Sequence, residues 1–339
     1  MMRVQAPESG VFSFDVPAAR PVATVRDYVA MARPDHWTKH IFVVPGIALA
    51  WILNPPSSPR ELVLPVLLGM LSACAVASAN YVLNEWLDLR FDRHHPVKSK
   101  RPAVQKDVSR AVVIGEYLVL AALGLALAAR VSDLFLVTSG LFLLSGLVYN
   151  VPGVRTKDRA YLDVVSEAIN NPLRLTLGWA MVWPQTLPPS SLLLAYWMGG
   201  AFLMAIKRFA EFRTVSKTAG RQALGLYRRS FRTYTENSLL ISGFLYAQLA
   251  AFFLAVFLIK YRVEYLLSMP LFAALFAAYL RVGLKHESVA QAPETLFREK
   301  VLMAVVLLLV GVLVFLTTYD LPQLERLTVP HYLPAPVTG

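Results

Sequence analysis

The sequence has little charge and almost no cysteine. Of its 339 residues only 16% are charged and one is a cysteine, whereas 56% are hydrophobic and the mean hydropathy is +0.50. This composition excludes a soluble enzyme or a disordered chain and is typical of a chain dissolved in lipid. The lone Cys74 excludes an intramolecular disulfide and a cysteine-based zinc cluster. A Gly-rich phosphate loop and an HExxH zinc motif are also absent.

Apolar runs long enough to cross a bilayer recur along the chain. About 20 apolar residues, at about 1.5 Å per residue, span a hydrocarbon core of about 30 Å. Runs bounded by charges or prolines predict an all-α membrane protein with nine transmembrane helices, at roughly 37–53, 62–83, 110–130, 133–150, 161–182, 191–206, 237–259, 265–281 and 301–319. We expect residues 1–35 to form a cytoplasmic segment with a short interfacial helix at 24–32, residues 36–320 the membrane domain, and residues 321–339 an external tail.

Positive charge is distributed unevenly between the predicted connections. With a cytoplasmic N-terminus, 27 of the 33 Lys and Arg residues fall on the cytoplasmic side and five fall outside, with Arg174 inside a helix. Cytoplasmic loops of membrane proteins carry such an excess of Lys and Arg. We therefore expect a multi-pass protein of a bacterial cytoplasmic (inner) membrane. Nucleic acid is not an expected partner, because the basic stretches are short and tethered to the membrane. The sequence leaves open whether the protein forms a homo-oligomer.

The second predicted helix ends in a stripe of oxygen-bearing side chains. Asn84, Asp88 and Asp92 are spaced by four residues, so each is turned only about 40° from the previous one and all share one helix face. Mg²⁺ prefers oxygen ligands and is usually held by one or two carboxylates together with substrate phosphates. The stripe therefore predicts a Mg²⁺–diphosphate site at the membrane surface. The alternative is a solvated helix end that Pro96 terminates.

A second polar stripe enters the fifth predicted helix. Asp163, Glu167, Asn171 and Arg174 follow at steps of four, four and three residues. Ionisable groups inside a transmembrane helix are costly and normally face a bundle interior or a wet cavity, which indicates function. The structural alternative is an ion pair of the Glu167–Arg174 type that fixes helix packing. Pro172 is expected to break the helical hydrogen-bond ladder in this stripe.

The third cytoplasmic connection combines cations with aromatic rings. Lys207 and Glu211 are four residues apart, and the later stretch from Tyr227 to Tyr234 alternates the two residue types. Positive-inside topology alone explains this charge. Phosphate capture by Lys207, Arg208 or Arg228 is the competing interpretation.

With these motifs the chain resembles the UbiA superfamily of intramembrane prenyltransferases. Asn84-Glu85-x-x-Asp88-x-x-x-Asp92 looks like the superfamily's first motif, NDxxDxxxD, with Glu85 in place of the usual Asp. Asp163 with Glu167 looks like the second acidic motif. The resemblance implies nine helices in a UbiA-type bundle around a central cavity that opens to the cytoplasmic side.

Within the superfamily, local motifs are most similar to those of decaprenyl-phosphate phosphoribosyltransferases. The stretch 33–40 resembles RPxQWxKN, His95-Pro96-x-Lys98-x-x-Arg101-Pro102 resembles HPxKxxRP, the stretch 207–211 looks like KRYAE, and Asp163 followed by Arg174 and Gly178 resembles D…R…G. This similarity implies Mg²⁺-dependent transfer of 5-phosphoribose from phosphoribosyl pyrophosphate to a polyprenyl phosphate in the membrane. Pyrophosphate would be released, in a step towards lipid-linked arabinofuranose donors.

The resemblance also implies roles for individual residues. Asn84, Asp88 and Asp92 would bind Mg²⁺, and the catalytic carboxylates would be Asp88, Asp92, Asp163 and Glu167, of which the last two would hold ribose hydroxyls or a second metal ion. Substrate-binding candidates are Lys39, Glu85, Lys98, Arg101, Tyr149, Lys157, Arg174, Lys207, Arg208 and Glu211.

Two rival functions use the same residues. A UbiA-type enzyme could instead transfer a prenyl group from an allylic diphosphate to an aromatic acceptor. The surplus of cations disfavours this reading, because an aromatic acceptor brings no phosphate. A transporter would use broken helices in matching halves of the chain, and only Pro172 offers such a break.

Overall fold

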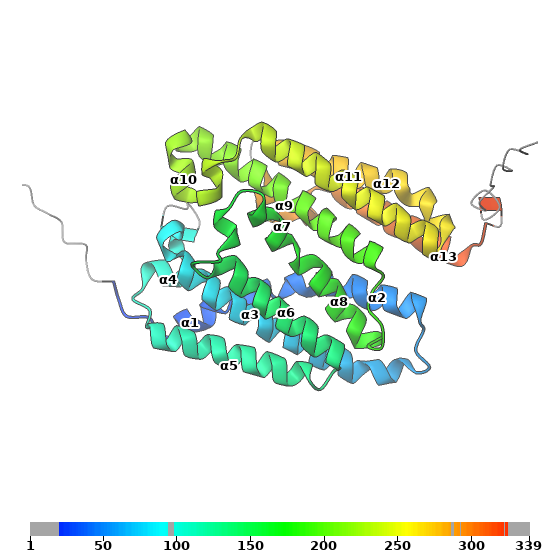
Figure 1. The fold of residues 1–339 in the computed structure, drawn as a ribbon, viewed down its shortest axis with the longest axis horizontal. Coiled ribbons are helices and arrows are strands. Elements are labelled where there is room, and N and C mark those ends of the chain that lie inside the picture. The colour runs from blue at the N-terminus through cyan, green and yellow to red at the C-terminus, as the bar shows by residue number, and fades with distance from the viewer. Residues whose placement is uncertain (1–19, 94–97, 286–287, 292, 322, 325–339) are drawn as a thin grey trace, which may run out of the picture.

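Helices lie side by side along the longest axis of the molecule (Figure 1). The computed structural model describes residues 20–93, 98–285, 288–291, 293–321 and 323–324, and these ranges contain no β-strand. The α-helices are α1 (Val25–Met31), α2 (Val44–Leu53), α3 (Val63–Asp92), α4 (Pro102–Gln105), α5 (Arg110–Ala128), α6 (Asp133–Asn150), α7 (Leu162–Ala168), α8 (Asn170–Val182), α9 (Ser190–Thr218), α10 (Leu224–Tyr227), α11 (Glu236–Tyr261), α12 (Met269–Leu284) and α13 (Lys300–Thr318). Short 3-10 segments connect several of them.

Within the described ranges, seven helical segments are long and apolar enough to cross a membrane. They are Pro59–Asp92, Arg110–Ala128, Asp133–Asn150, Ser190–Thr218, Glu236–Tyr261, Val263–Leu284 and Lys300–Thr318. Each coincides with one of the crossings predicted from the sequence. The expected all-helical, multi-pass membrane protein is thereby confirmed.

The first and fifth predicted crossings are each divided into two shorter segments. The first is a 3-10 segment, Pro34–Val43, followed by α2, which has only ten residues. The fifth is divided into α7 and α8, which are separated by Ile169. Because neither contains a helix of the length needed to cross a bilayer alone, the count of nine crossings stays a prediction.

Pro172 explains the interruption of the fifth crossing. Proline has no backbone N–H, so it cannot bond the carbonyl four residues earlier, which belongs to Ala168. The side-chain amide of Asn171 donates to that carbonyl instead, at 3.1 Å. Asn171 therefore satisfies the carbonyl that Pro172 leaves without a backbone donor, and the expected interruption lies at Ile169, three residues before Pro172.

Two glycines bring α2 and α8 into backbone contact. A Cβ atom on Gly46 would collide with the carbonyl oxygen of Leu175, and one on Gly178 would collide with that of Val43. Small residues allow this kind of close approach between helices in a membrane. The contact places α8, and with it Arg174, against the first predicted crossing.

The helix predicted near the N-terminus is present as α1. The backbone N–H and the hydroxyl of Thr24 both donate to the Asp27 carboxylate at 2.8 Å, which closes the first turn. Met31 packs on Val82 of α3. The predicted external tail lies outside the described residues except for 321, 323 and 324, as do residues 1–19 of the predicted N-terminal segment.

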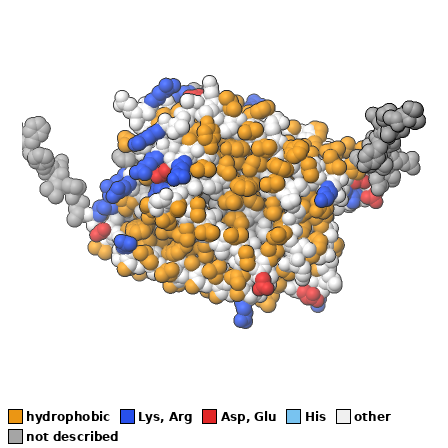
Figure 2. All heavy atoms as spheres, viewed as in Figure 1, with side chains coloured by type: hydrophobic (Ala, Val, Ile, Leu, Met, Phe, Trp, Pro, Cys, Tyr) orange, Lys and Arg blue, Asp and Glu red, His pale blue; other side chains and the backbone are white. Residues whose placement is uncertain are grey.

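The cations gather at one end of the bundle. On the face shown in Figure 2, hydrophobic side chains cover the middle and Lys and Arg collect at the end where Figure 1 places α4 and α10. We call this the basic end; it is formed by the connections 98–105, 151–161 and 219–235. With 30 residues, or about 45 Å at 1.5 Å per residue, α3 is longer than the hydrocarbon core. Its acidic C-terminal turns reach the basic end.

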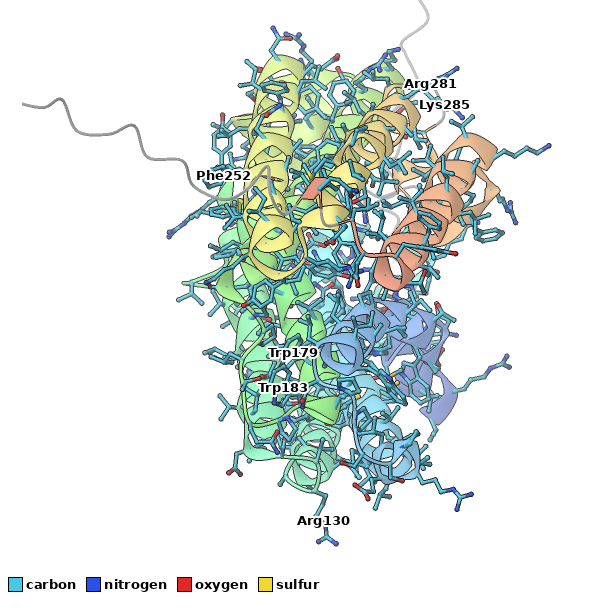
Figure 3. All side chains as sticks on the ribbon, turned by 90° about the vertical axis from the view of Figure 1, so that its right-hand side faces the viewer. Arg130, Trp179, Trp183, Phe252, Arg281 and Lys285 are labelled. Atoms are coloured by element: carbon cyan, nitrogen blue, oxygen red, sulfur yellow. The ribbon has the colours of Figure 1, made fainter. Side chains whose placement is uncertain are left out.

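The first and last described parts of the chain lie at opposite ends of the bundle (Figure 1), as an odd number of crossings requires. Figure 3 views the molecule from the end opposite the basic end, where Arg130 points away from the bundle. Trp179 and Trp183 stack near this end with ring centroids 5.4 Å apart.

Cysteine labelling tests the orientation of these ends. In a Cys74→Ser background, a membrane-impermeant maleimide is expected to label Thr233→Cys only from the cytoplasm and Ser57→Cys only from outside, since both positions are exposed, one at the basic end and one in the α2–α3 connection. Labelling of both from the same side would contradict the predicted topology.

Candidate active site

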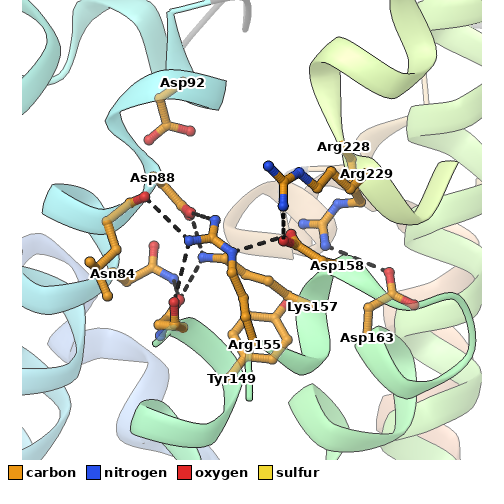
Figure 4. A network of polar contacts seen from close by, with 12 residues as sticks. Asn84, Asp88, Asp92, Tyr149, Arg155, Lys157, Asp158, Asp163, Arg228 and Arg229 are labelled. Atoms are coloured by element: carbon orange, nitrogen blue, oxygen red, sulfur yellow. Dashed lines mark hydrogen bonds and ion pairs between the residues drawn. The ribbon is translucent and has the colours of Figure 1, made fainter. Parts of the chain in front are cut away.

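Three segments that are far apart in the sequence meet at the basic end. The C-terminal turns of α3 face the connection between α6 and α7 and the connection between α9 and α11 (Figure 4). Asn84, Asp88 and Asp92 lie along one side of α3, as their spacing predicts. The side chains of Asp88 and Asp92 are 14% and 4% exposed, respectively. Their charges are therefore largely removed from water and need partners.

Two cations from the α6–α7 connection contact the same oxygen of Asp88. The Nη2 atom of Arg155 lies 2.6 Å and the Nζ atom of Lys157 2.5 Å from Asp88 Oδ1. Lys157 was among the predicted substrate-binding residues, whereas Arg155 was not. The only sequence signal for Arg155 is its place among the three cations of the short connection 151–160.

Two further cations contact Asp92. Arg101 forms a short ion pair with its carboxylate, and Lys98 lies 4.0 Å from it. Both come from the segment after α3, where HPxKxxRP was recognised. His95 and Pro96 of that motif lie outside the described residues.

Glu85 and Asn84 hold the surroundings of this site in place. Glu85 is 2% exposed and accepts a hydrogen bond from the backbone N–H of Ala103 at 3.3 Å, with Arg101 at 4.0 Å. Asn84 donates through Nδ2 to Asn150 at 2.6 Å. Lys157 donates to the same oxygen of Asn150, also at 2.6 Å. Because its nitrogen is engaged in this bond and cannot coordinate a cation, Asn84 would bind a cation through its amide oxygen.

Asp163 anchors the α9–α11 connection. Its side chain is fully buried, and its two oxygens accept hydrogen bonds from Tyr234 at 2.7 Å and from Ser230 at 2.9 Å. Arg208 and Arg228 each approach within 3.6 Å. Sequence reasoning missed Ser230 and Tyr234, because nothing local connects them to a residue about 70 positions earlier.

Arg208 links the second acidic motif to α9. It is 2% exposed and lies 2.5 Å from Glu167 and 2.8 Å from Glu211. The Tyr149 hydroxyl also donates to Glu167, at 2.6 Å. The structure therefore brings together four of the predicted site residues in one network.

Asp158 joins the two loops that carry the cations. It accepts from Arg155 and from Arg229, both at 3.2 Å. The two guanidinium groups lie 5.2 and 5.5 Å from the centre of the Phe91 ring. This bridge, visible in Figure 4, ties both loops to the end of α3.

Burial lowers the pKa of two lysines at the basic end. It lowers the pKa of both Lys98 and Lys157 to about 8, although the nearby Asp92 and Asp88 carboxylates oppose this effect. At pH 7 both amines remain mostly protonated, so they can serve as anion ligands.

Two predicted cations, Arg174 and Lys207, lie apart from these pairs. Arg174 lies over the Phe142 ring at 5.3 Å and makes no hydrogen bond or ion pair within the described part of the chain. Lys207 is half-buried on α9, close enough to Glu167 and Glu211 to act on them electrostatically. The side chain of Lys39 is outside the described set.

The donor set of α3 fits Mg²⁺. Among the described residues, no group of three or more His, Cys, Asp and Glu side chains is arranged to hold a metal ion. Asn84, Asp88 and Asp92 instead provide two carboxylates and an amide along one side of a helix. Mg²⁺ commonly takes this few protein ligands and completes its shell with substrate phosphates and water.

One cavity at the basic end is lined by none of the predicted site residues. Its volume is about 670 Å³, and Phe231 and Tyr234 form part of its wall. Tyr234 therefore contacts both this cavity and Asp163. The central cavity implied by the family resemblance stays a prediction.

The helical fold is that of a membrane-embedded protein, and the family match shows that it is a transferase. Residues 41–301 match the model of the UbiA prenyltransferase family, and the chain belongs to that family.

Curated relatives share moderate sequence identity with the chain. The nodulation protein NoeC of Azorhizobium caulinodans is 31% identical over 206 residues, which cover 60% of this chain and 62% of that protein, slightly less than two thirds of its length. The decaprenyl-phosphate phosphoribosyltransferase of Mycolicibacterium smegmatis is 24% identical over 66% of this chain and 67% of its own. The Mycobacterium tuberculosis enzyme of the same name is 26% identical over 67% and 72%.

Solved structures show the same fold. A UbiA homolog from Archaeoglobus fulgidus bound to DMAPP and Mg²⁺ superposes with a TM-score of 0.64 at 20% identity, covering 87% of this chain and all of that one. A digeranylgeranylglyceryl phosphate synthase structure gives a TM-score of 0.57 at 16% identity, over 85% of this chain and 98% of that one.

Proposed function

We propose that the protein transfers 5-phosphoribose from phosphoribosyl pyrophosphate to a polyprenyl phosphate and releases pyrophosphate. The observation that carries this proposal is the presence of cations in three separate places. They are grouped around Asp88 and Asp92, around Glu167 and Glu211, and singly at Arg174. The proposed reactants bring three anionic ends, namely a diphosphate, a 5-phosphate and a lipid phosphate. The two phosphoribosyltransferase relatives support the same substrates.

The donor diphosphate would be bound in two ways, through Mg²⁺ held by the side chains of α3 and directly by cations of the loops. Asn84, Asp88 and Asp92 would hold Mg²⁺. A bound Mg²⁺ ion would neutralise the negative charge that develops on the leaving group. Lys98, Arg101 and Lys157 lie beside these carboxylates and would contact diphosphate oxygens. The bond between ribose C1 and the diphosphate oxygen breaks, and a bond between C1 and an oxygen of the lipid phosphate forms. That oxygen is already anionic, so the step needs no general base.

The two carboxylates of the second motif would play different parts. Both oxygens of the buried Asp163 already accept hydrogen bonds, so we propose that it positions Arg208 and Arg228. Glu167 is 28% exposed, which leaves it accessible to a ribose hydroxyl. Lys207 and Arg228 would contact the 5-phosphate.

A substrate comparison tests this proposal directly. Purified protein in lipid vesicles is offered radiolabelled phosphoribosyl pyrophosphate with decaprenyl phosphate, or a prenyl diphosphate with hydroxybenzoate, each with Mg²⁺. We expect a labelled phosphoribosyl lipid from the first pair and no product from the second. Prenylated hydroxybenzoate without any phosphoribosyl lipid would establish the rival function instead.

Arg174 would bind the phosphate of the lipid substrate and not the soluble donor. It lies on α8, seven residues beyond Glu167, and has no carboxylate partner among the described residues. A charge-assisted contact contributes roughly 1.5–3 kcal/mol, so Arg174→Gln should raise the KM for polyprenyl phosphate about ten- to a hundredfold and leave that for phosphoribosyl pyrophosphate unchanged. Steady-state kinetics with each substrate varied in turn measure this split.

Arg130→Gln is the matched control, because Arg130 is exposed at the opposite end of the bundle. It should alter neither KM. An equal rise of both KM values in Arg174→Gln would assign Arg174 to helix packing.

A further inference from the structure

One carboxylate oxygen of Asp88, Oδ1, already has two protein cations as partners. Arg155 Nη2 and Lys157 Nζ both contact its Oδ1 atom, at 2.6 and 2.5 Å. The side chains of these two cations are only 10% and 6% exposed, so water screens the contacts poorly. A Mg²⁺ ion binds oxygen at about 2.0–2.1 Å. It cannot approach Oδ1 while both cations stay there, because of space and of charge repulsion.

The two cations differ in what else holds them. Arg155 also donates to Asp158 at 3.2 Å and to the carbonyls of Leu87 and Asn150, each at 3.3 Å. Lys157 has the Asn150 side chain at 2.6 Å as its second partner. Each can therefore leave Asp88 without losing all of its contacts, and each remains beside α3.

We propose that Arg155 and Lys157 are resident counter-ions of Asp88 that transfer to the donor diphosphate when the metal ion binds. They keep the carboxylate neutralised before the substrate arrives and then contact the phosphate oxygens that accompany the metal. The metal ion and the diphosphate consequently bind together. The metal ion alone binds weakly, because the two cations still occupy Asp88. This inference rests on the metal–diphosphate part of the proposed function and is independent of which group the diphosphate carries.

The counter-ion role predicts changes of opposite sign. In Arg155→Gln and in Lys157→Met, Mn²⁺ alone should bind more tightly, because a competing cation has been removed. Inorganic pyrophosphate in the presence of Mn²⁺ should bind more weakly, because a phosphate ligand has been lost. Each change should be roughly ten- to a hundredfold, the range for one charge-assisted contact. Electron paramagnetic resonance of free Mn²⁺, with and without pyrophosphate, measures both affinities on purified protein without turnover.

Arg159→Gln is the matched control, because it removes the same charge from the same loop at an exposed position. It should leave both affinities unchanged. A purely structural role would weaken both affinities together in the Arg155 and Lys157 variants, and that result, or an unchanged Mn²⁺ affinity in both, would overturn the inference. If the opposite changes are found while phosphoribosyl pyrophosphate is not a substrate, the counter-ion role stands and the proposed donor is wrong.

Discussion

Replacing Asp88 with asparagine should lower turnover by at least a hundredfold while the protein still folds. The substitution keeps the shape of the side chain but removes the charge that faces Arg155 and Lys157. It also removes one of the two carboxylates available to Mg²⁺ on α3. Two contacts would be lost in the transition state, that of Asp88 with Mg²⁺ and that of Mg²⁺ with the leaving diphosphate. At roughly 1.5–3 kcal/mol for each charge-assisted contact, this loss corresponds to at least a hundredfold in kcat.

The measurement is kcat at saturating Mg²⁺, together with the thermal midpoint of the detergent-solubilised protein. Asp92→Asn provides a second variant on the same side of α3 and should also lose turnover. Asp133→Asn is the control, since Asp133 is an exposed carboxylate at the start of α6, away from the basic end. Near-normal turnover in both α3 variants would eliminate the metal–diphosphate site.

Replacing Arg208 with methionine should strongly destabilise the protein. Arg208 is 2% exposed and lies among three carboxylates, those of Asp163, Glu167 and Glu211. Removing one partner of a buried ion pair leaves an uncompensated charge, which costs about 3–5 kcal/mol. We expect a fall of this size in the free energy of unfolding, measured by denaturant titration in detergent.

Arg213→Met is a matched control on the same helix. Arg213 is 23% exposed and reaches Glu236 at 3.8 Å, and partly exposed pairs of this kind contribute about 1 kcal/mol or less. Adding Glu211→Gln to Arg208→Met should restore part of the stability, because it removes one of the unpaired charges. Equal stability of the Arg208 and Arg213 variants would contradict the network.

Regular spacing made part of the site predictable. Asn84, Asp88 and Asp92 share one side of α3 because four residues nearly complete one turn of a helix, and this geometry follows from the sequence alone. Local motifs also indicated Lys98, Arg101 and Arg208, and the structure places these residues beside the acidic motifs. Their metal and substrate roles stay predictions.

Other parts of the site depend on contacts between distant segments. Arg155 resembles any other loop cation until the fold brings it to Asp88, 67 positions earlier. Ser230 and Tyr234 carry no motif, yet they occupy both oxygens of Asp163. Side-chain partners of this kind are decided by which loops meet at the basic end, and helical periodicity contains no information about that.

The sequence by itself determined the membrane class, seven of the apolar crossings and the acidic side of α3. Length, hydropathy and helical spacing are local properties, so the order of residues suffices to predict them. Only the tertiary structure decided that the first predicted crossing is divided and which cation neutralises which carboxylate. Buried charges must find partners wherever packing places them, and in this protein those partners come from segments far apart in the chain.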